Sequence, residues 1–428
     1  MSATEAAQAP AFSLRSLLAI RSYRLVWSGQ MVSDFSDSLT RMVLLLMINR
    51  ITGSVASIAS LTIVLMLPRL LFGFAAGVFV DRLNRKHLMV LSGILRGAFV
   101  LGFLLIDSPE RLWLLYLIAF LQGSVATFFE PARMALLPNL VPAEGLLAAN
   151  SVSMTSQSIF MILGSAAAGV LVGQLDSYAP IFLANSAAFL LSALLIGAIR
   201  YQHAPRAQTR DISGRLFLAE LWEGIRISFG TRVLLGTIAA IGLTMLGVGA
   251  TNVLMIPMLV NDLRIPETWL GATNAGEAIG ILIGGGLIAA LSARFRPTHL
   301  VTIGLVGLGA GLAAIAFAEN IWHVIAIELL LGMFIPAVNS STQTILQTAV
   351  PDTLRGRTGA ARMVLVMLVN LVSMGLAGGL ADRMGARNVF ILGGACAVLG
   401  GIAALMIFRG VDIHPNRPIE PELTQEIQ

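Results

Sequence analysis

The sequence predicts an all-α integral membrane protein with twelve transmembrane helices in two six-helix repeats. Hydrophobic residues make up 56% of the 428 residues and charged residues only 12%, and the mean hydropathy is +0.83. Apolar runs of membrane-spanning length, about 20 residues, recur along the whole chain. Several residues of the first half also recur in the second half at one constant offset. A soluble protein of this length would need far more charge to cover its surface.

Twelve apolar runs are long enough to cross a bilayer as helices. We expect them at 23–49, 56–80, 88–107, 112–132, 147–174, 179–199, 233–260, 268–292, 298–318, 321–345, 355–380 and 388–408. The polar segment 200–232 divides them into two sets of six. The predicted organisation is a cytoplasmic N-terminal segment (1–22), a first bundle (23–199), a cytoplasmic linker (200–232), a second bundle (233–408) and a cytoplasmic tail (409–428).

Basic residues predict the orientation of these spans. With the N-terminus inside, twenty Arg and Lys residues lie in the predicted cytoplasmic segments or at the cytoplasmic ends of spans, and five lie outside: Arg50, Arg111, Arg264, Arg383 and Arg387. The positive-inside rule therefore places both termini in the cytoplasm. The net charge of +5 then reflects topology, and we expect no nucleic-acid partner.

The N-terminus is not expected to be a cleaved signal peptide, because Arg15 interrupts a short apolar run. Phe12–Arg21 is predicted to be an amphipathic segment on the cytoplasmic surface; the alternative is a partly ordered tail. The single cysteine, Cys396, excludes an internal disulfide.

The two halves predict an internal duplication. The pairs at the shared offset are Gly77 with Gly286, Arg85 with Arg294, Gly123 with Gly332, Val141-Pro142 with Val350-Pro351, and Gly169 with Gly378. The copies differ at Asp81, which corresponds to Ala290, and at Arg82, which corresponds to Leu291. Any switch built on Asp81 is therefore expected in one half only.

A tight connection between the second and third spans carries the strongest motif, Gly77-x-x-x-Asp81-Arg82-x-x-Arg85-Lys86. It resembles the signature loop of the major facilitator superfamily. That loop usually has a second glycine where Asn84 stands, and Asn tolerates left-handed backbone better than most residues. The resemblance implies the major facilitator fold, with a substrate site near mid-membrane between the halves.

A second set of motifs resembles one branch of this superfamily. Glu130-Pro131-Ala132-Arg133, with Leu147–Ser151 and Thr52-Gly53-Ser54, is similar to bacterial enterobactin exporters and macrolide-type efflux pumps. Drug–proton antiporters of the superfamily often carry an Arg four residues before the glycine at Gly123, but Ala119 stands there. The run Gly164–Gly169 also lacks the proline common in their fifth helix. These departures leave the direction of transport open.

The first span carries three charges on one helix face: Asp34, Asp37 and Arg41, at i, i+3 and i+7. A charge at mid-membrane costs at least about 2.5 kcal/mol, so these side chains are expected to avoid lipid. We predict a proton-coupling site in which Asp37 is the main carboxylate, Asp34 assists and Arg41 tunes it. The alternative is a static Asp37–Arg41 pair.

Further charges lie well inside predicted spans, among them Arg69, Arg96, Glu277 and Glu328. Arg69 is expected to face the cavity or to pair with an acid of the first span, and Arg96 is either structural or functional. Neither glutamate has a basic neighbour one turn away. An unpaired carboxyl group in a low-dielectric environment favours its protonated form, as a proton carrier requires. We assign this role to Glu328 and leave Glu277 open.

The signature loop is predicted to act as a cytoplasmic gate. As the resemblance implies, the Asp81 carboxylate would meet the start of the eleventh span, where free N–H groups favour an anion. Arg85 would pair with Glu130 and hold the loop on its own half. Gly77 and Arg82 complete the predicted gating set. The alternative is that the basic residues only set topology.

The predicted function is secondary active export of a hydrophobic or amphipathic small molecule, of drug, macrolide or siderophore type, by proton antiport and alternating access. No G-x-x-x-x-G-K-[ST] sequence occurs and the five histidines are scattered, so we expect no ATPase, enzyme, cofactor or metal site. The expected location is a bacterial inner membrane, as a monomer. The alternatives are metabolite uptake, lysophospholipid transport, or a membrane sensor without transport.

Overall fold

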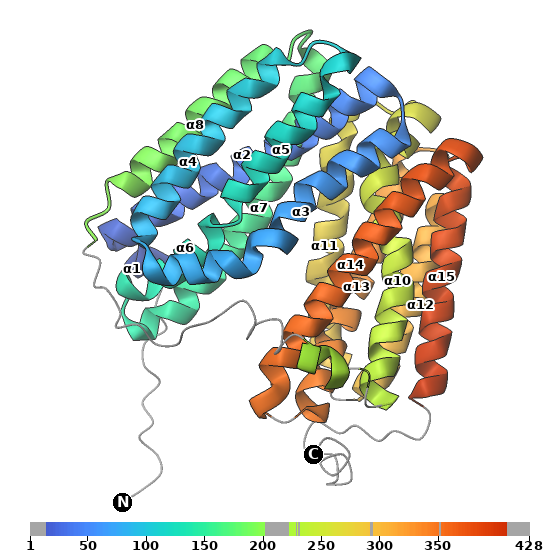
Figure 1. The fold of residues 1–428 in the computed structure, drawn as a ribbon. Helices are drawn as coiled ribbons and strands as arrows, with labels where there is room; N and C mark the ends of the chain where they lie inside the picture. The colour runs from blue at the N-terminus through green and yellow to red at the C-terminus, as the bar shows by residue number, and fades with distance from the viewer. Residues whose placement is uncertain are drawn as a thin grey trace, which may run out of the picture. The chain divides into compact units, whose positions relative to one another are not determined.

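The computed structural model describes residues 14–201, 222–227, 229, 232–291, 294–350 and 352–408. This part of the chain is helical throughout, with short connections and no strand (Figure 1). Most of the predicted linker (202–221) and the tail (409–428) fall outside it, as do residues 1–13 of the predicted N-terminal segment.

Each of the twelve predicted spans is helical. In the first half the helices are α1 (Leu14–Ala19), α2 (Arg21–Thr52), α3 (Val55–Arg82), α4 (Arg85–Gly102), α5 (Leu112–Ala126), α6 (Phe129–Leu136), α7 (Leu146–Gln174) and α8 (Ala179–Gly197). In the second half they are α10 (Arg232–Ile256), α11 (Leu270–Leu291), α12 (Pro297–Ile315), α13 (Ile321–Ala349), α14 (Asp352–Met384) and α15 (Ala386–Ile407). Within the described residues, ten helical segments are long and apolar enough to cross a membrane. The total of twelve spans, and the side on which the termini lie, stay predictions.

One predicted span is divided. The stretch expected as a single helix over 112–132 consists of α5 and α6, which are separated at Thr127 and Phe128. Pro131 is the third residue of α6. A proline is tolerated in the first turn of a helix, where its missing N–H would have no intrahelical partner, but it is unfavourable in the middle of one. The break therefore places Pro131 where it costs little.

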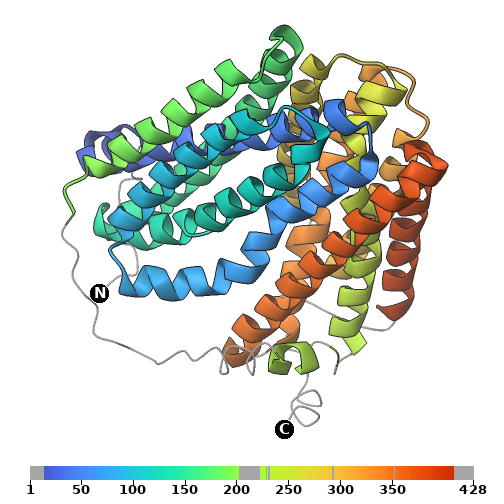
Figure 2. The same ribbon diagram turned by 45° about the horizontal axis from the view of Figure 1, so that its top comes forward.

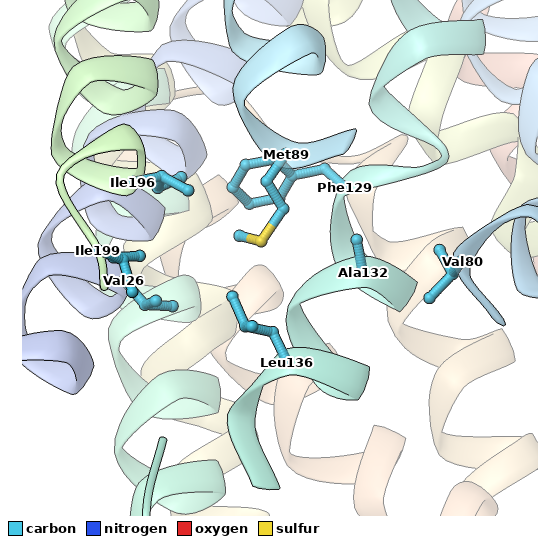
Figure 3. Close-up of a cluster of buried hydrophobic side chains, with 8 residues drawn as sticks. All are labelled: Val26, Val80, Met89, Phe129, Ala132, Leu136, Ile196 and Ile199. Atoms are coloured by element: carbon cyan, nitrogen blue, oxygen red, sulfur yellow. The ribbon is translucent and has the colours of Figure 1, made fainter. Parts of the chain in front are cut away.

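Contacts divide the chain into two compact units, of which the first contains residues 1–43 and 65–209. Within it α4 packs against α8, α5 and α6, as both ribbon views show (Figures 1 and 2). Eight apolar residues from four helices and the end of α8 form a buried cluster at one end of this unit (Figure 3): Val26, Val80, Met89, Phe129, Ala132, Leu136, Ile196 and Ile199. The cluster fixes α6 against α4, beside the charged residues described below.

The second unit contains residues 44–64 and 210–428. Here α15 packs against α10 and α12, and α11 packs against α13. Small residues allow these helices to approach closely: a Cβ atom at Gly280 would overlap the carbonyl oxygen of Leu329, and one at Gly332 would overlap that of Glu277. The turn that joins α2 to α3 belongs to this unit.

Candidate functional site

The predicted charge cluster on α2 lies in the first unit, on a helix face that is partly open. Asp34 is half-buried and Arg41 is exposed. The amide of Gln30 donates a hydrogen bond to the Asp34 carboxylate, Nε2 to Oδ2 at 3.1 Å, and another to the carbonyl of Ser153 at 3.3 Å. Gln30 itself is buried. The acid at position 34 is therefore tied to α7 through a fixed polar side chain.

Asp37 is paired across helices with Arg96 of α4. The Arg96 Nη1 atom lies 2.6 Å from Oδ2 of Asp37, and the exposed fractions of the two side chains are 1% and 32%. The Arg96 Nε atom also donates to the Ser92 carbonyl at 3.3 Å. The guanidinium group lies over two aromatic rings, 4.7 Å from the centre of Phe129 and 4.8 Å from that of Phe189. Cation–π contacts of this kind stabilise a desolvated cation.

Arg41 also acts electrostatically on Asp37, but from beyond salt-bridge distance, so the tuning role of Arg41 and the static Asp37–Arg41 alternative both stay predictions. The salt bridge of Asp37 runs to Arg96, because the aromatic cage holds that guanidinium against α2. No salt bridge to Arg41 occurs among the described residues. From the sequence alone, Arg96 could have either a structural or a functional role. In the structure it contacts Asp37, the predicted main carboxylate.

The acids of the second half lie in the second unit. Glu328, on α13, is 5% exposed, and Glu277, on the neighbouring α11, is half-buried and within electrostatic reach of it. The two glutamates thus lie on helices that pack against each other.

Two of the predicted gating residues, Arg85 and Glu130, have other partners than the prediction gave them. Arg85 is buried and donates to the Ala135 carbonyl at 2.9 Å, whereas Glu130 forms its salt bridge with Arg133, one turn along α6. The expected Arg85–Glu130 pair is absent because an i, i+3 partner on the same helix is nearer.

The rest of the loop is only partly described. Asn84 caps α4, and its side chain accepts hydrogen bonds from the backbone N–H groups of Lys86 and His87. Its φ of −66° is not left-handed, so Asn serves here as a cap rather than as a glycine substitute. Arg82 is exposed. The side chains at Gly77 and Asp81 fall outside the described ones, so the contact of Asp81 stays a prediction.

Sequence reasoning missed Arg133 and the two phenylalanines of the cage. Glu130 and Arg133 stand at i, i+3, so their pairing could have been read from the sequence. The cage has no such signal: Phe129 and Phe189 come from α6 and α8, and only the packing of both helices on α4 brings them to Arg96.

Comparison with known proteins gives one family. The family model of the Major Facilitator Superfamily matches residues 26–247 and 237–426. The chain is 23% identical to macrolide efflux protein A of Streptococcus pyogenes, over 89% of this chain and 95% of that protein. It is 26% identical to the multidrug efflux pump Tap of Mycolicibacterium fortuitum, over 80% of this chain and 85% of that one.

Solved structures agree on the fold. A bacterial homologue of the iron transporter ferroportin, in an inward-facing state, superposes with a TM-score of 0.71 at 18% identity, over 94% of this chain and all (100%) of that one. A bacterial homologue of the human lysosomal transporter spinster gives 0.66 at 15% identity, over 90% and 94%. At these identities the likeness concerns the fold alone.

Proposed function

Since the chain belongs to the major facilitator superfamily and is therefore a multi-pass membrane transporter, we propose that it exports a hydrophobic or amphipathic small molecule by proton antiport. Its curated relatives named above are efflux proteins, which favours export over uptake. The proposed location is the bacterial inner membrane, and the proposed cycle is alternating access.

One observation carries this proposal: Asp37, on a helix that the sequence predicts to cross the membrane, is both paired and partly exposed. Its side chain retains 32% of its exposure while its partner Arg96 is buried. An acid sealed within packed helices could not exchange protons with water, and a fully exposed one would have no reason to lie in a membrane span. Asp37 has both properties that a proton carrier needs, which are access to water and a partner that stabilises its charge.

In the proposed coupling this acid has two states, one of which is the pairing seen in the structure. When Asp37 is ionised, it pairs with Arg96 across α2 and α4. When Asp37 is protonated the ion pair is lost, but Arg96 keeps its Ser92 contact and its two aromatic rings. The proton therefore changes the attraction between α2 and α4 and leaves the arginine in place. A ligand or proton shifts a conformational equilibrium only through such a difference between states.

The test is transport in inside-out membrane vesicles that contain the full chain. A panel of labelled macrolides, cationic dyes and siderophores is offered while a proton gradient is imposed. We expect uptake of at least one compound into the vesicles, and its collapse when a protonophore is added. Uptake that is unchanged by the protonophore, but that requires another ion gradient, would refute proton antiport while leaving transport itself intact.

A further inference from the structure

We propose that the open face of α2 binds an acidic group of the transported molecule, through Arg41 of α2 and Arg69 of α3. This inference rests on the proposed function and names its substrate class: an amphipathic oxyanion, which carries a carboxylate, a phosphate or a similar group.

The first observation is that Arg41 has no salt bridge of its own among the described residues and only shares the charge of Asp37 with Arg96. The two carboxylates on its own helix face are engaged elsewhere, Asp37 by Arg96 at 2.6 Å and Asp34 by Gln30 at 3.1 Å. Arg41 is exposed, and no salt bridge to it occurs among the described residues. An arginine that only shares an acid, in a helix that is predicted to cross the membrane, is costly and is by default a functional group.

The second observation is a second cation nearby. Arg69 directly follows Pro68 within α3. It is exposed, has no salt bridge among the described residues, and is within electrostatic reach of Arg41. Two like charges repel, so an anion that both can contact lowers the energy of the pair. Guanidinium groups bind carboxylates and phosphates in bidentate geometry, which a hydrophobic cargo with an acidic head would use.

The test uses two probes of equal chain length and opposite charge, decyl phosphate and decyltrimethylammonium. Binding to the full chain in phosphatidylcholine nanodiscs is followed by thermal unfolding and by tryptophan fluorescence. Decyl phosphate should bind more tightly than the cation. Arg41→Gln and Arg69→Gln should each weaken its binding about tenfold, which corresponds to one lost charge-assisted hydrogen bond. Arg111→Gln, which removes an exposed arginine outside the cluster, is the matched control.

Three outcomes would overturn the anion site: equal binding of both probes, phosphate binding that survives both substitutions, or the same loss in the control. The proposed function fails separately. If a proton gradient drives efflux of ethidium and the Arg41→Gln, Arg69→Gln double variant retains it, export stands and the substrate class is wrong.

A different set of contacts supports a second inference, at the turn between α2 and α3. The first backbone N–H groups of α3 donate to the Asp382 carboxylate, from Val55 at 3.0 Å and from Ala56 at 3.4 Å, and the Ser54 hydroxyl donates at 3.2 Å. Asp382 lies near the C-terminal end of α14. It thus caps the N-terminus of another helix, where a carboxylate is favoured by free N–H groups and by the helix dipole.

Further polar contacts hold the same turn. The Arg50 Nε atom donates to Glu267 at 2.9 Å, and that glutamate is 7% exposed. Asn49 and Asn261 exchange hydrogen bonds through their side-chain amides at 3.3 and 3.2 Å. All of these residues belong to the second unit, whereas the remainder of α2 and α3 belongs to the first.

The sequence around Asp382 repeats the signature loop. Gly378-x-x-x-Asp382-Arg383-x-Gly385 has the glycine, acid and arginine of Gly77-x-x-x-Asp81-Arg82 at the same spacing. Gly385 has a φ of +83°, the left-handed backbone for which glycine is suited. Asp81 was predicted to cap the start of α14. Asp382, near the end of α14, is seen to cap the start of α3.

We infer that Asp382 and the Arg50–Glu267 pair form a latch on the α2–α3 turn, at the end of these helices opposite Asp81. The two acids are then alternatives: Asp81 holds one conformational state and Asp382 the other. The same Asp-Arg pair stands at the end of α3 and one residue before the end of α14.

The latch is tested by distance measurement between spin labels at Ile51→Cys and Met384→Cys in a Cys396→Ala background. Without further changes we expect one short distance. Asp382→Asn combined with Glu267→Gln should add a longer distance and raise its population severalfold. Asp107→Asn, in an exposed ion pair with Arg111, is the control acid. If folded, monodisperse protein shows one unchanged distance distribution in all variants, the latch does not exist.

Discussion

The Asp37 carboxylate accepts a hydrogen bond of 2.6 Å from Arg96, a residue 59 positions later in the chain. This contact joins α2, which carries Asp34, Asp37 and Arg41 on one predicted face, to Arg96, whose role the sequence left open. It gives the first prediction a defined chemical basis.

Replacing Asp37 by Asn is expected to abolish gradient-driven transport, because the amide cannot carry a proton and cannot form an ion pair with Arg96. The protein should still insert, since the side-chain shape is kept. Vesicle uptake under an imposed proton gradient measures this, with Asp107→Asn as the control. Full proton-dependent transport by the Asp37→Asn protein would contradict the coupling role.

Replacing Arg96 by Gln should destabilise the protein, because it leaves the Asp37 carboxylate without its partner and empties the aromatic cage. Removing one member of a buried pair costs roughly 3–5 kcal/mol; we expect about 2–3 kcal/mol here, because Asp37 is partly exposed. Thermal unfolding in detergent gives the value. The double variant with Asp37→Asn should recover part of the loss; strictly additive losses would show that the two residues are not coupled.

Two glycines of α11 should respond in opposite ways to alanine. Gly280→Ala places a methyl group against the Leu329 backbone of α13 and should cost about 1–3 kcal/mol. Gly285→Ala meets nothing within 4 Å and should be neutral or stabilising by up to about 1 kcal/mol, since alanine favours helix. The midpoint of thermal unfolding distinguishes them. Equal effects would mean that α11 and α13 are not closely packed.

Glu328 is predicted to become accessible to water in at least one state of the transport cycle, although it is 5% exposed in this structure. A Glu328→Cys variant in the Cys396→Ala background should therefore react with a small polar thiol reagent, and faster during turnover than at rest. If the thiol in a folded and active variant never reacts, Glu328 is a packing residue and not a proton carrier.

Asp81→Asn is expected to slow turnover and to populate the state that is open to the cytoplasm, because the amide loses its attraction for the start of α14. Each such helix-end contact is worth about 0.5–2 kcal/mol, enough to shift a balanced equilibrium severalfold. Spin labels on the predicted cytoplasmic ends of α3 and α14 report the distance. If the variant keeps the distance distribution of the unmodified protein, the loop only determines topology.

The sequence predicted the helices well, because long apolar runs and their polar breaks are local signals. It also identified Asp34, Asp37 and Arg41 as one face of α2, since helix periodicity alone decides that. It did not identify Arg96 as the partner of Asp37, because that contact depends on the packing of α4, α6 and α8, which no spacing within α2 encodes.

The failed Arg85–Glu130 pairing has a similar origin. The sequence offered Glu130 two cations, and the general family pattern favoured the distant one over Arg133, which is one helical turn away. The repeated motif at Asp382 does not follow the constant offset that relates the two halves, so comparison of the halves at that offset does not detect it.

The backbone contacts between α11 and α13 have a mechanical consequence. Where Gly280 meets Leu329 and Gly332 meets Glu277, no side chain separates the two helices, so neither can tilt or slide alone without a clash of main-chain atoms. The pair is expected to move as one rigid body that carries Glu277 and Glu328 together. Any rearrangement that changes the surroundings of these two acids must then come from helices on either side of the pair, not from shear within it.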